Sequence, residues 1–128
     1  MSFKSLPGEC VLLPKKTGAI ELLWVVLTSP DENSEVVIVN LTSFDSGFDR
    51  TVILNKGDHS FVDHDTIINY VDARIVKAHA LIHAAESGFF DSLEPFKADI
   101  LQKIQEGLFR SPHTPIKVKN FCKGKIDP

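Results

Sequence analysis

Four short runs rich in Val, Ile, Leu and Thr dominate the first half of the chain, and turn-forming residues separate them. The runs are ECVLLP, IELLWVVLTS, EVVIVNLTS and RTVIL, and the separating clusters are KKTG, SPDENS and FDSGFD. Runs of this kind at this spacing predict a small antiparallel sheet that curls toward a barrel. The segments TIINYV and ARIVKAHAL extend the pattern, so one or two further strands are expected there.

The pattern becomes helical after Leu81. The segment LIHAAESG predicts a short helix that ends at Gly88. A long helix is predicted in EPFKADILQKIQEGLFRS, where apolar residues recur on one face at helical spacing: Phe96, Ile100, Leu101, Ile104 and Leu108. After SPHTP, the alternation in IKVKNF predicts a final edge strand. The expected fold is therefore mainly β with a C-terminal helix, containing about five to seven strands, one long helix and one short helix.

Length and composition are those of an ordinary globular domain. The chain has 128 residues, of which 43% are hydrophobic and 24% are charged, so we expect one domain over residues 1–128. Apolar runs such as ELLWVVL are too short to cross a membrane, and MSFKSLPGEC lacks the apolar core of a signal peptide. A cytoplasmic protein without a membrane partner is expected.

Charge and cysteine content exclude some classes of function. A net charge of -3 and a pI near 5.9 argue against a surface that attracts nucleic acid all over. The lysines of the tail IKVKNFCKGKIDP indicate a local basic edge or, more simply, a solubilising tail. Cys10 and Cys122 lie near opposite ends of the chain without zinc-finger or CxxC spacing, so no metal knuckle, redox pair or cofactor is indicated.

Three phrases in this order, LWVVLTSP, VVIVNLTSF and GDHSFVDHDTIINYVDARIV, resemble a subgroup of the MazF/PemK-like family of small toxin-type proteins. The resemblance covers about residues 7–110 of the chain. It implies an SH3-like barrel with a C-terminal helix, often as a homodimer. In the active members it implies a metal-independent endoribonuclease that is held in check by an antitoxin partner. Such a resemblance transfers fold more safely than activity.

The resemblance also implies an Arg just before the second strand and a Thr or Ser just after the third. The phrase NLTS supplies Thr42 and Ser43 at the second place. At the first place the chain has Glu21, Leu22 and Leu23 and no Arg. The family Arg stabilises the charge of the phosphorane during RNA cleavage, which Leu cannot do. Either the activity has been lost or another residue supplies the charge.

RNA cleavage without a metal requires a base for the 2′-hydroxyl proton, an acid for the leaving 5′-oxygen, and a donor for the phosphate oxygens. His59 and His64 in KGDHSFVDHD are the expected acid-base pair, because histidine titrates near neutral pH. Thr42 and Ser43 complete the predicted catalytic set. Four residues are predicted to bind the substrate. Arg50 and Lys56 would donate hydrogen bonds to phosphate, and the rings of Phe44 and Phe48 would stack on bases.

Other interpretations of these residues stay open. In the structural interpretation, which we favour for the segment itself, Asp58 and His59 bond within a turn after Gly57, and Asp63, His64 and Asp65 begin the next strand. A weaker alternative is a metal site formed by Asp58, His59, His64 and Asp65, or by His79 and His83. We expect Arg74 to form an ion pair with Asp72 or another neighbour rather than to contact a phosphate. The remaining aromatic residues are predicted to lie in the core: Trp24, Phe61, Phe89, Phe90 and Phe96.

Two functions of different classes follow. The first is a MazF/PemK-like protein that binds single-stranded RNA and cleaves it without metal, in a groove that His59, His64, Arg50, Thr42 and Ser43 line. The second is a catalytically inactive family member that acts as a protein-binding module through a helix face or a strand edge. The missing Arg and the acidic pI favour the second, whereas the Thr-Ser pair and the clustered histidines favour the first. A metal-dependent hydrolase is a third, weaker hypothesis.

Overall fold

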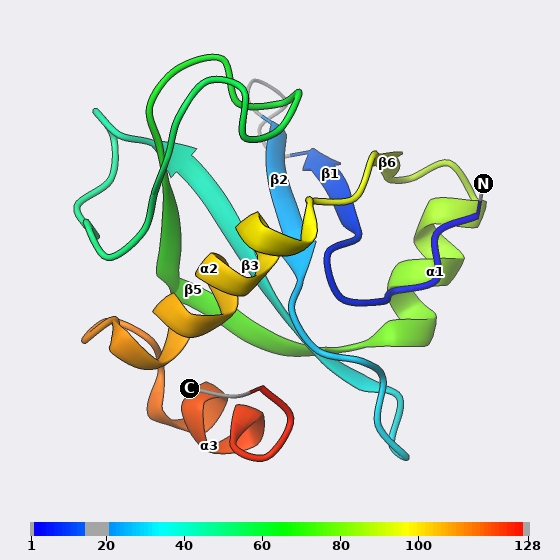
Figure 1. The fold of residues 1–128 in the computed structure, drawn as a ribbon. Coiled ribbons are helices and arrows are strands. Elements are labelled where there is room, and N and C mark those ends of the chain that lie inside the picture. Colours follow the sequence, from blue (N-terminus) through cyan, green and yellow to red (C-terminus); the bar gives the residue numbers. More distant parts are fainter. Residues whose placement is uncertain (1, 15–20, 127–128) are drawn as a thin grey trace.

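The computed structural model describes residues 2–14 and 21–126. In these residues six strands form one sheet in the order β4-β5-β3-β2-β1-β6, and all neighbouring strands are antiparallel (Figure 1). The elements, in chain order, are β1 Cys10–Pro14, β2 Glu21–Val26, β3 Glu35–Ser43, β4 Ile53–Leu54, β5 Thr66–Lys77, α1 Ala78–Glu86, β6 Asp91–Leu93, α2 Ala98–Arg110 and α3 Ile116–Cys122.

The sheet curls into a half-barrel, and α2 lies across its concave side with α3 beside the end of α2 (Figure 1). The apolar face predicted for α2 is buried there, and Leu101 at its margin is partly buried. Burying each large aliphatic side chain stabilises the fold by about 1.5–3 kcal/mol relative to exposing it. The main inner-face residues are Val37, Val39 and Leu41 of β3, Ile68 and Tyr70 of β5, and Ile100, Ile104 and Leu108 of α2.

A break in register bends β5 sharply. Ile38 of β3 pairs with Arg74, whereas Asn40 pairs with Asn69, so a step of two residues on β3 faces a step of five on β5. Extra residues on one strand of an antiparallel pair bend that strand and increase its twist. The bent β5 then runs directly into α1 (Figure 1).

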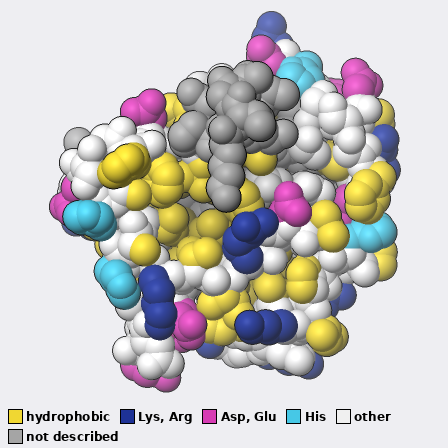
Figure 2. Space-filling model, turned by 180° about the vertical axis from the view of Figure 1, so that it is seen from behind, with side chains coloured by type: hydrophobic (Ala, Val, Ile, Leu, Met, Phe, Trp, Pro, Cys, Tyr) yellow, Lys and Arg dark blue, Asp and Glu magenta, His cyan; other side chains and the backbone are white. Residues whose placement is uncertain are grey.

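The outer face of the sheet carries a second apolar cluster, which includes Val26, Val36 and Ile38 and is partly covered by Ala78 and Leu81 of α1. Figure 2 shows this side of the molecule, where Lys and Arg side chains are set among hydrophobic ones. The Arg74 guanidinium lies 4.8 Å from the centre of the Trp24 ring. Its Nε donates to the backbone oxygen of Asp72 at 3.1 Å, in place of the side-chain ion pair that we expected.

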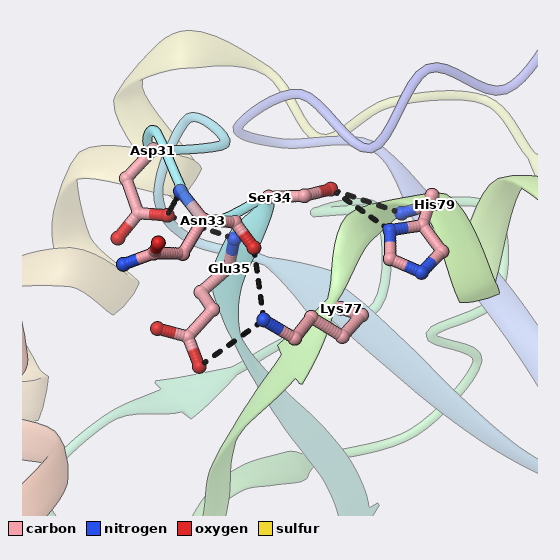
Figure 3. Close-up of polar contacts among 6 residues, drawn as sticks. All are labelled: Asp31, Asn33, Ser34, Glu35, Lys77 and His79. Atoms are coloured by element: carbon pink, nitrogen blue, oxygen red, sulfur yellow. Dashed lines mark hydrogen bonds and ion pairs between the residues drawn. The ribbon is translucent and has the colours of Figure 1, made fainter.

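Ser34, in the turn before β3, closes the N-terminus of α1 (Figure 3). The backbone oxygen of Ser34 accepts from the amide of Ala78 at 2.6 Å, and its Oγ accepts from the amide of His79 at 3.3 Å. No side chain at the start of α1 provides such a cap. Ser34 has a φ of 59°, in the left-handed region, which lets one residue present both acceptors to the helix.

The sequence-based fold is confirmed in its coarse form, a mainly β fold with C-terminal helices, but two details were wrong. The expected strand IKVKNF is α3, because Val118 and Cys122 lie four residues apart and share one buried helical face, while Ile116 is exposed. The strand that we expected to reach Leu81 ends at Lys77. The next residue, Ala78, begins α1, and its amide donates to the backbone oxygen of Ser34. Among the described helices, none is long and apolar enough to span a membrane.

Candidate functional site

The site begins where β3 ends and β5 starts. Ser43 pairs with Thr66, and the amide of Phe44 donates to the backbone oxygen of Asp65 at 3.0 Å. This pairing places residues 63–65 beside the end of β3. The Nε2 atom of His64 lies 3.2 Å from Oγ of Ser43, and its Nδ1 atom lies 2.5 Å from Oδ1 of Asp63. A serine, a histidine and an aspartate are therefore connected in a chain at the surface.

The Asp63 carboxylate orients the imidazole of His64. When Nδ1 carries the proton and donates to Asp63, Nε2 is left as the acceptor for the Ser43 hydroxyl. The hydrogen bond from His64 and the charge of its imidazolium lower the pKa of Asp63, so this carboxyl group stays ionised well below neutral pH. The His64 and Asp63 side chains are 60% and 79% exposed, which leaves them open to a substrate.

Arg50 carries a positive charge and stacks on the residue that follows Ser43. Its guanidinium lies 3.9 Å from the centre of the Phe44 ring, and Phe44 directly follows Ser43. Nη1 of Arg50 donates to the backbone oxygen of Gly47 at 2.8 Å, which fixes the direction of the side chain. A stacked guanidinium keeps several N–H donors free for a phosphate.

A buried contact anchors the loop that carries Arg50. Oγ of Ser111, which follows α2, donates to Oδ2 of Asp49 at 2.6 Å, and both residues are buried. The other oxygen of Asp49 accepts from the amide and the hydroxyl of Thr51 at 2.9 and 2.6 Å. Burial opposes the ionisation of Asp49, but these hydrogen bonds outweigh it, so the pKa of Asp49 lies below its usual range. The loop is therefore tied to the α2–α3 connection.

His59 has a different environment from His64. It is buried, stacks on Phe96 with ring centres 4.3 Å apart, and has Nε2 at 2.7 Å from the backbone oxygen of Glu94. Its Nδ1 accepts from the amide of Phe61 at 3.1 Å, so Nε2 is the protonated nitrogen. Both ring nitrogens are occupied in the neutral imidazole, which is the arrangement of a structural histidine.

The other predicted site residues separate into packing and surface positions. The methyl group of Thr42 lies against Gly47, and a side chain at position 47 would overlap it. Lys56 is exposed and contributes, after His64, to the lowered pKa of Asp63. Oδ2 of Asp58 accepts from the amide of Asn55 at 2.8 Å, as expected for a turn. Asp65 accepts from the side-chain amide of Asn55 at 3.1 Å.

The metal alternative gains no support from geometry. Across residues 2–14 and 21–126, no group of three or more His, Cys, Asp or Glu side chains is arranged to hold a metal ion, including the segment with His59 and His64. His79 and His83 are both exposed on α1. A pocket of about 240 Å³ lies elsewhere, lined by Ser2, Phe3 and Glu9 on one side and by residues 92–95 on the other. It contains none of the predicted site residues.

Aromatic residues divide between the core and the surface. Trp24 and Phe96 are buried as predicted, whereas Phe61 and Phe89 are exposed, against the prediction. Both lie in connections between secondary-structure elements, where no neighbouring segment covers them. Their hydrophobicity alone therefore gave the wrong prediction. Phe48 is 59% exposed and makes an edge contact with His113.

Two residues near the site were missed as functional candidates from the sequence. Asp63 was interpreted only as part of the start of a strand, although an acidic residue directly before a histidine is a local signal. His113 lies in the segment SPHTP, where no local pattern connects it to Phe48. Their neighbours are set by the pairing of β3 with β5 and by the Asp49–Ser111 contact.

Comparison of the chain with family models, with curated proteins and with solved structures found no match.

Proposed function

We propose that this chain is a MazF/PemK-like protein with an SH3-like barrel fold that binds single-stranded RNA and cleaves it without a metal ion. The observation that carries the proposal is the Asp63–His64–Ser43 chain, with a 2.5 Å contact at Nδ1 and a 3.2 Å contact at Nε2 of His64. It is exposed at the end of β3, and Arg50 stacks on Phe44, the residue that follows Ser43. Ser43 is also one of the two residues that the family resemblance assigns to the site.

In the proposed reaction, the 2′-oxygen of one ribose attacks the neighbouring phosphorus. Nε2 of His64 takes the 2′-hydroxyl proton, and Asp63 stabilises the resulting imidazolium through Nδ1. The bond to the 5′-oxygen breaks, a water molecule protonates that oxygen, and the hydroxide formed recovers the proton from His64. The products are a 2′,3′-cyclic phosphate and a free 5′-hydroxyl.

Arg50 replaces the missing family Arg in this proposal. Its guanidinium is held over Phe44 and donates to the non-bridging phosphate oxygens as their negative charge increases. The Ser43 hydroxyl, next to Nε2 of His64, donates to the same phosphate or positions the 2′-hydroxyl. His59 is not included, because hydrogen bonds occupy both of its ring nitrogens.

The test is cleavage of a long single-stranded RNA by the purified protein in excess chelator. The wild-type protein should cut, and His64→Ala should lower the rate by about 10²–10⁴-fold, the usual effect of a general base. Asp63→Asn should also lower it, because an amide NH₂ facing Nδ1 favours the other imidazole tautomer. The control is His83→Ala, an exposed histidine on α1.

End-group analysis should find 2′,3′-cyclic phosphates, and RNA with 2′-deoxyribose at the cut position should stay intact. Cleavage that His64→Ala leaves unchanged, or that the chelator abolishes, would contradict the mechanism.

The protein-binding alternative is favoured by a different observation. Phe89, after α1, and Ile116, on α3, are 73% and 71% exposed, more than the other large apolar side chains described. RNA that stays intact at high protein concentration would favour this alternative, in which an antitoxin-like partner or a second copy of the chain covers such residues. Size measurement of the purified protein would distinguish a homodimer from a monomer that binds another protein.

A further inference from the structure

Phe48, on the loop that follows Ser43, forms an aromatic pair with His113, which lies in the connection between α2 and α3. Their ring centres are 4.8 Å apart and their planes are nearly perpendicular, at 89°. Phe48 is 59% exposed, and His113 is exposed as well. No described residue makes a hydrogen bond to the ring nitrogens of His113. The pair therefore offers a bare aromatic surface beside an available polar edge.

Hydrogen bonds hold the backbone of this aromatic pair in place. Phe48 directly precedes Asp49, whose carboxylate accepts from Ser111 at 2.6 Å. Oγ of Ser111 in turn accepts from the amide of His113 at 3.1 Å. One buried contact thus fixes the backbone under both rings, although they lie on different connections. A preorganised surface binds a ligand with less loss of conformational entropy.

We infer that Phe48 and His113 form a stacking site for one unpaired nucleobase of single-stranded RNA. The base stacks on the exposed face of Phe48, and His113 offers its ring nitrogens to polar groups of the base. Base–aromatic stacking contributes to binding with little dependence on sequence, because every base has an aromatic face. This inference rests on the proposed function, since it assigns the substrate of the Ser43–His64 site a second point of contact.

The location of the pair suits an RNA strand bound at Ser43. Phe48 lies five positions after Ser43, so their backbones are at most about 17 Å apart even if that stretch were fully extended. Arg50 follows Phe48 by two positions and stacks on Phe44, so the loop that carries Phe48 also carries a guanidinium that can donate to a phosphate. The stacked base therefore belongs to a nucleotide close to the cut phosphate. A base inside a duplex has no free face, so the substrate must be single-stranded at this point.

The first experiment separates binding from cleavage. A short fluorescent oligonucleotide of 2′-O-methyl nucleotides has no 2′-hydroxyl to attack, so its affinity can be measured by anisotropy without being cut. Phe48→Ala should weaken binding by about 5- to 100-fold, the range for losing one stacked base. Phe48→Trp should preserve binding. The matched control is Phe89→Ala, which removes another exposed phenyl ring after α1.

The second experiment locates the base. In a series of oligonucleotides, one base at a time is replaced by an abasic site. Wild-type affinity should drop at one position, and Phe48→Ala should remove that difference while the other positions keep their effects. His113→Ala should reduce the effect of the abasic site at that same position and leave its effect at the other positions unchanged.

These outcomes also distinguish the inference from the cleavage mechanism. Phe48-dependent binding of an oligonucleotide, together with intact RNA in the cleavage assay, supports the stacking site and contradicts the proposed catalysis. RNA cleavage that depends on His64, with binding that Phe48→Ala leaves unchanged, overturns the stacking site and preserves the catalysis. A wild-type protein that binds no oligonucleotide overturns the inference outright.

Discussion

The hydroxyl of Tyr70 on β5 donates a 2.7 Å hydrogen bond to the backbone oxygen of Ile104 on α2. Tyr70 is fully buried, and Gly107, one turn further along α2, gives its ring room. A side chain on Gly107 would overlap both Oη of Tyr70 and a methyl group of Val52. The bend of β5 and the missing side chain on α2 thus fit one another.

Replacing Gly107 should therefore destabilise the protein. Although Ala is the better helix former, Gly107→Ala introduces a methyl group where there is no space, and overpacking of this kind costs about 1–3 kcal/mol. Tyr70→Phe keeps the packing and loses one buried hydrogen bond, for about 1 kcal/mol. Urea unfolding measures both, with Lys103→Ala on the exposed side of α2 as the control. Unchanged stability of Gly107→Ala would show that Tyr70 can move away from α2.

The Ser34 cap should be measurable in the same way. Ser34→Ala removes the Oγ acceptor for the His79 amide and keeps a Cβ atom at this φ of 59°, where any side chain is strained. We expect a loss of about 1 kcal/mol in the free energy of unfolding, and a smaller loss for Ser34→Gly, which suits that conformation. Ser29→Ala, at an exposed serine in the same connection, should have no effect. Equal losses for Ala and Gly would argue against a contribution from backbone strain.

Asp49 should make stability depend on pH. Its pKa is lower in the folded protein than in the unfolded chain, so folding stabilises its ionised form. The contribution is fully present above the unfolded pKa of about 3.9 and is lost as pH falls through the folded pKa. We expect Asp49→Asn to cost about 1–3 kcal/mol at pH 7 and progressively less below about pH 4.

Unfolding free energies of wild-type protein and Asp49→Asn across this pH range test the linkage, with the exposed Asp45→Asn as the matched control. A difference that is the same at pH 7 and pH 3 would mean that Asp49 stabilises the loop without its charge.

Both cysteines should be unreactive in the folded protein. Burial raises the pKa of Cys10 to about 12 and that of Cys122 to about 11, so almost no thiolate is present at neutral pH. With a chromogenic disulfide reagent at pH 8, we expect both thiols to react no faster than the folded protein unfolds locally or globally. In denaturant, both should react rapidly. Fast labelling of either thiol in the folded state would contradict the burial described above.

Elements with local signals were predictable from the sequence, and contacts set by long-range pairing were not. The apolar face of α2 repeats at helical spacing, so Ile100, Ile104 and Leu108 could be assigned to the core. In α3, six residues matched an alternating pattern equally well, and only packing against the core decides for a helix. The Ser43–His64 contact depends on the register of β3 with β5, and the Phe48–His113 contact depends on Asp49 and Ser111. No local pattern encodes either relationship.

The cap that Ser34 places on α1 also constrains the order in which the protein folds. A helix of nine residues is too short to be stable by itself in water. The acceptor for its His79 amide comes from a residue 45 positions earlier, in the turn that connects β2 to β3. We therefore expect α1 to form late in folding, and its amides to exchange with solvent whenever that turn opens.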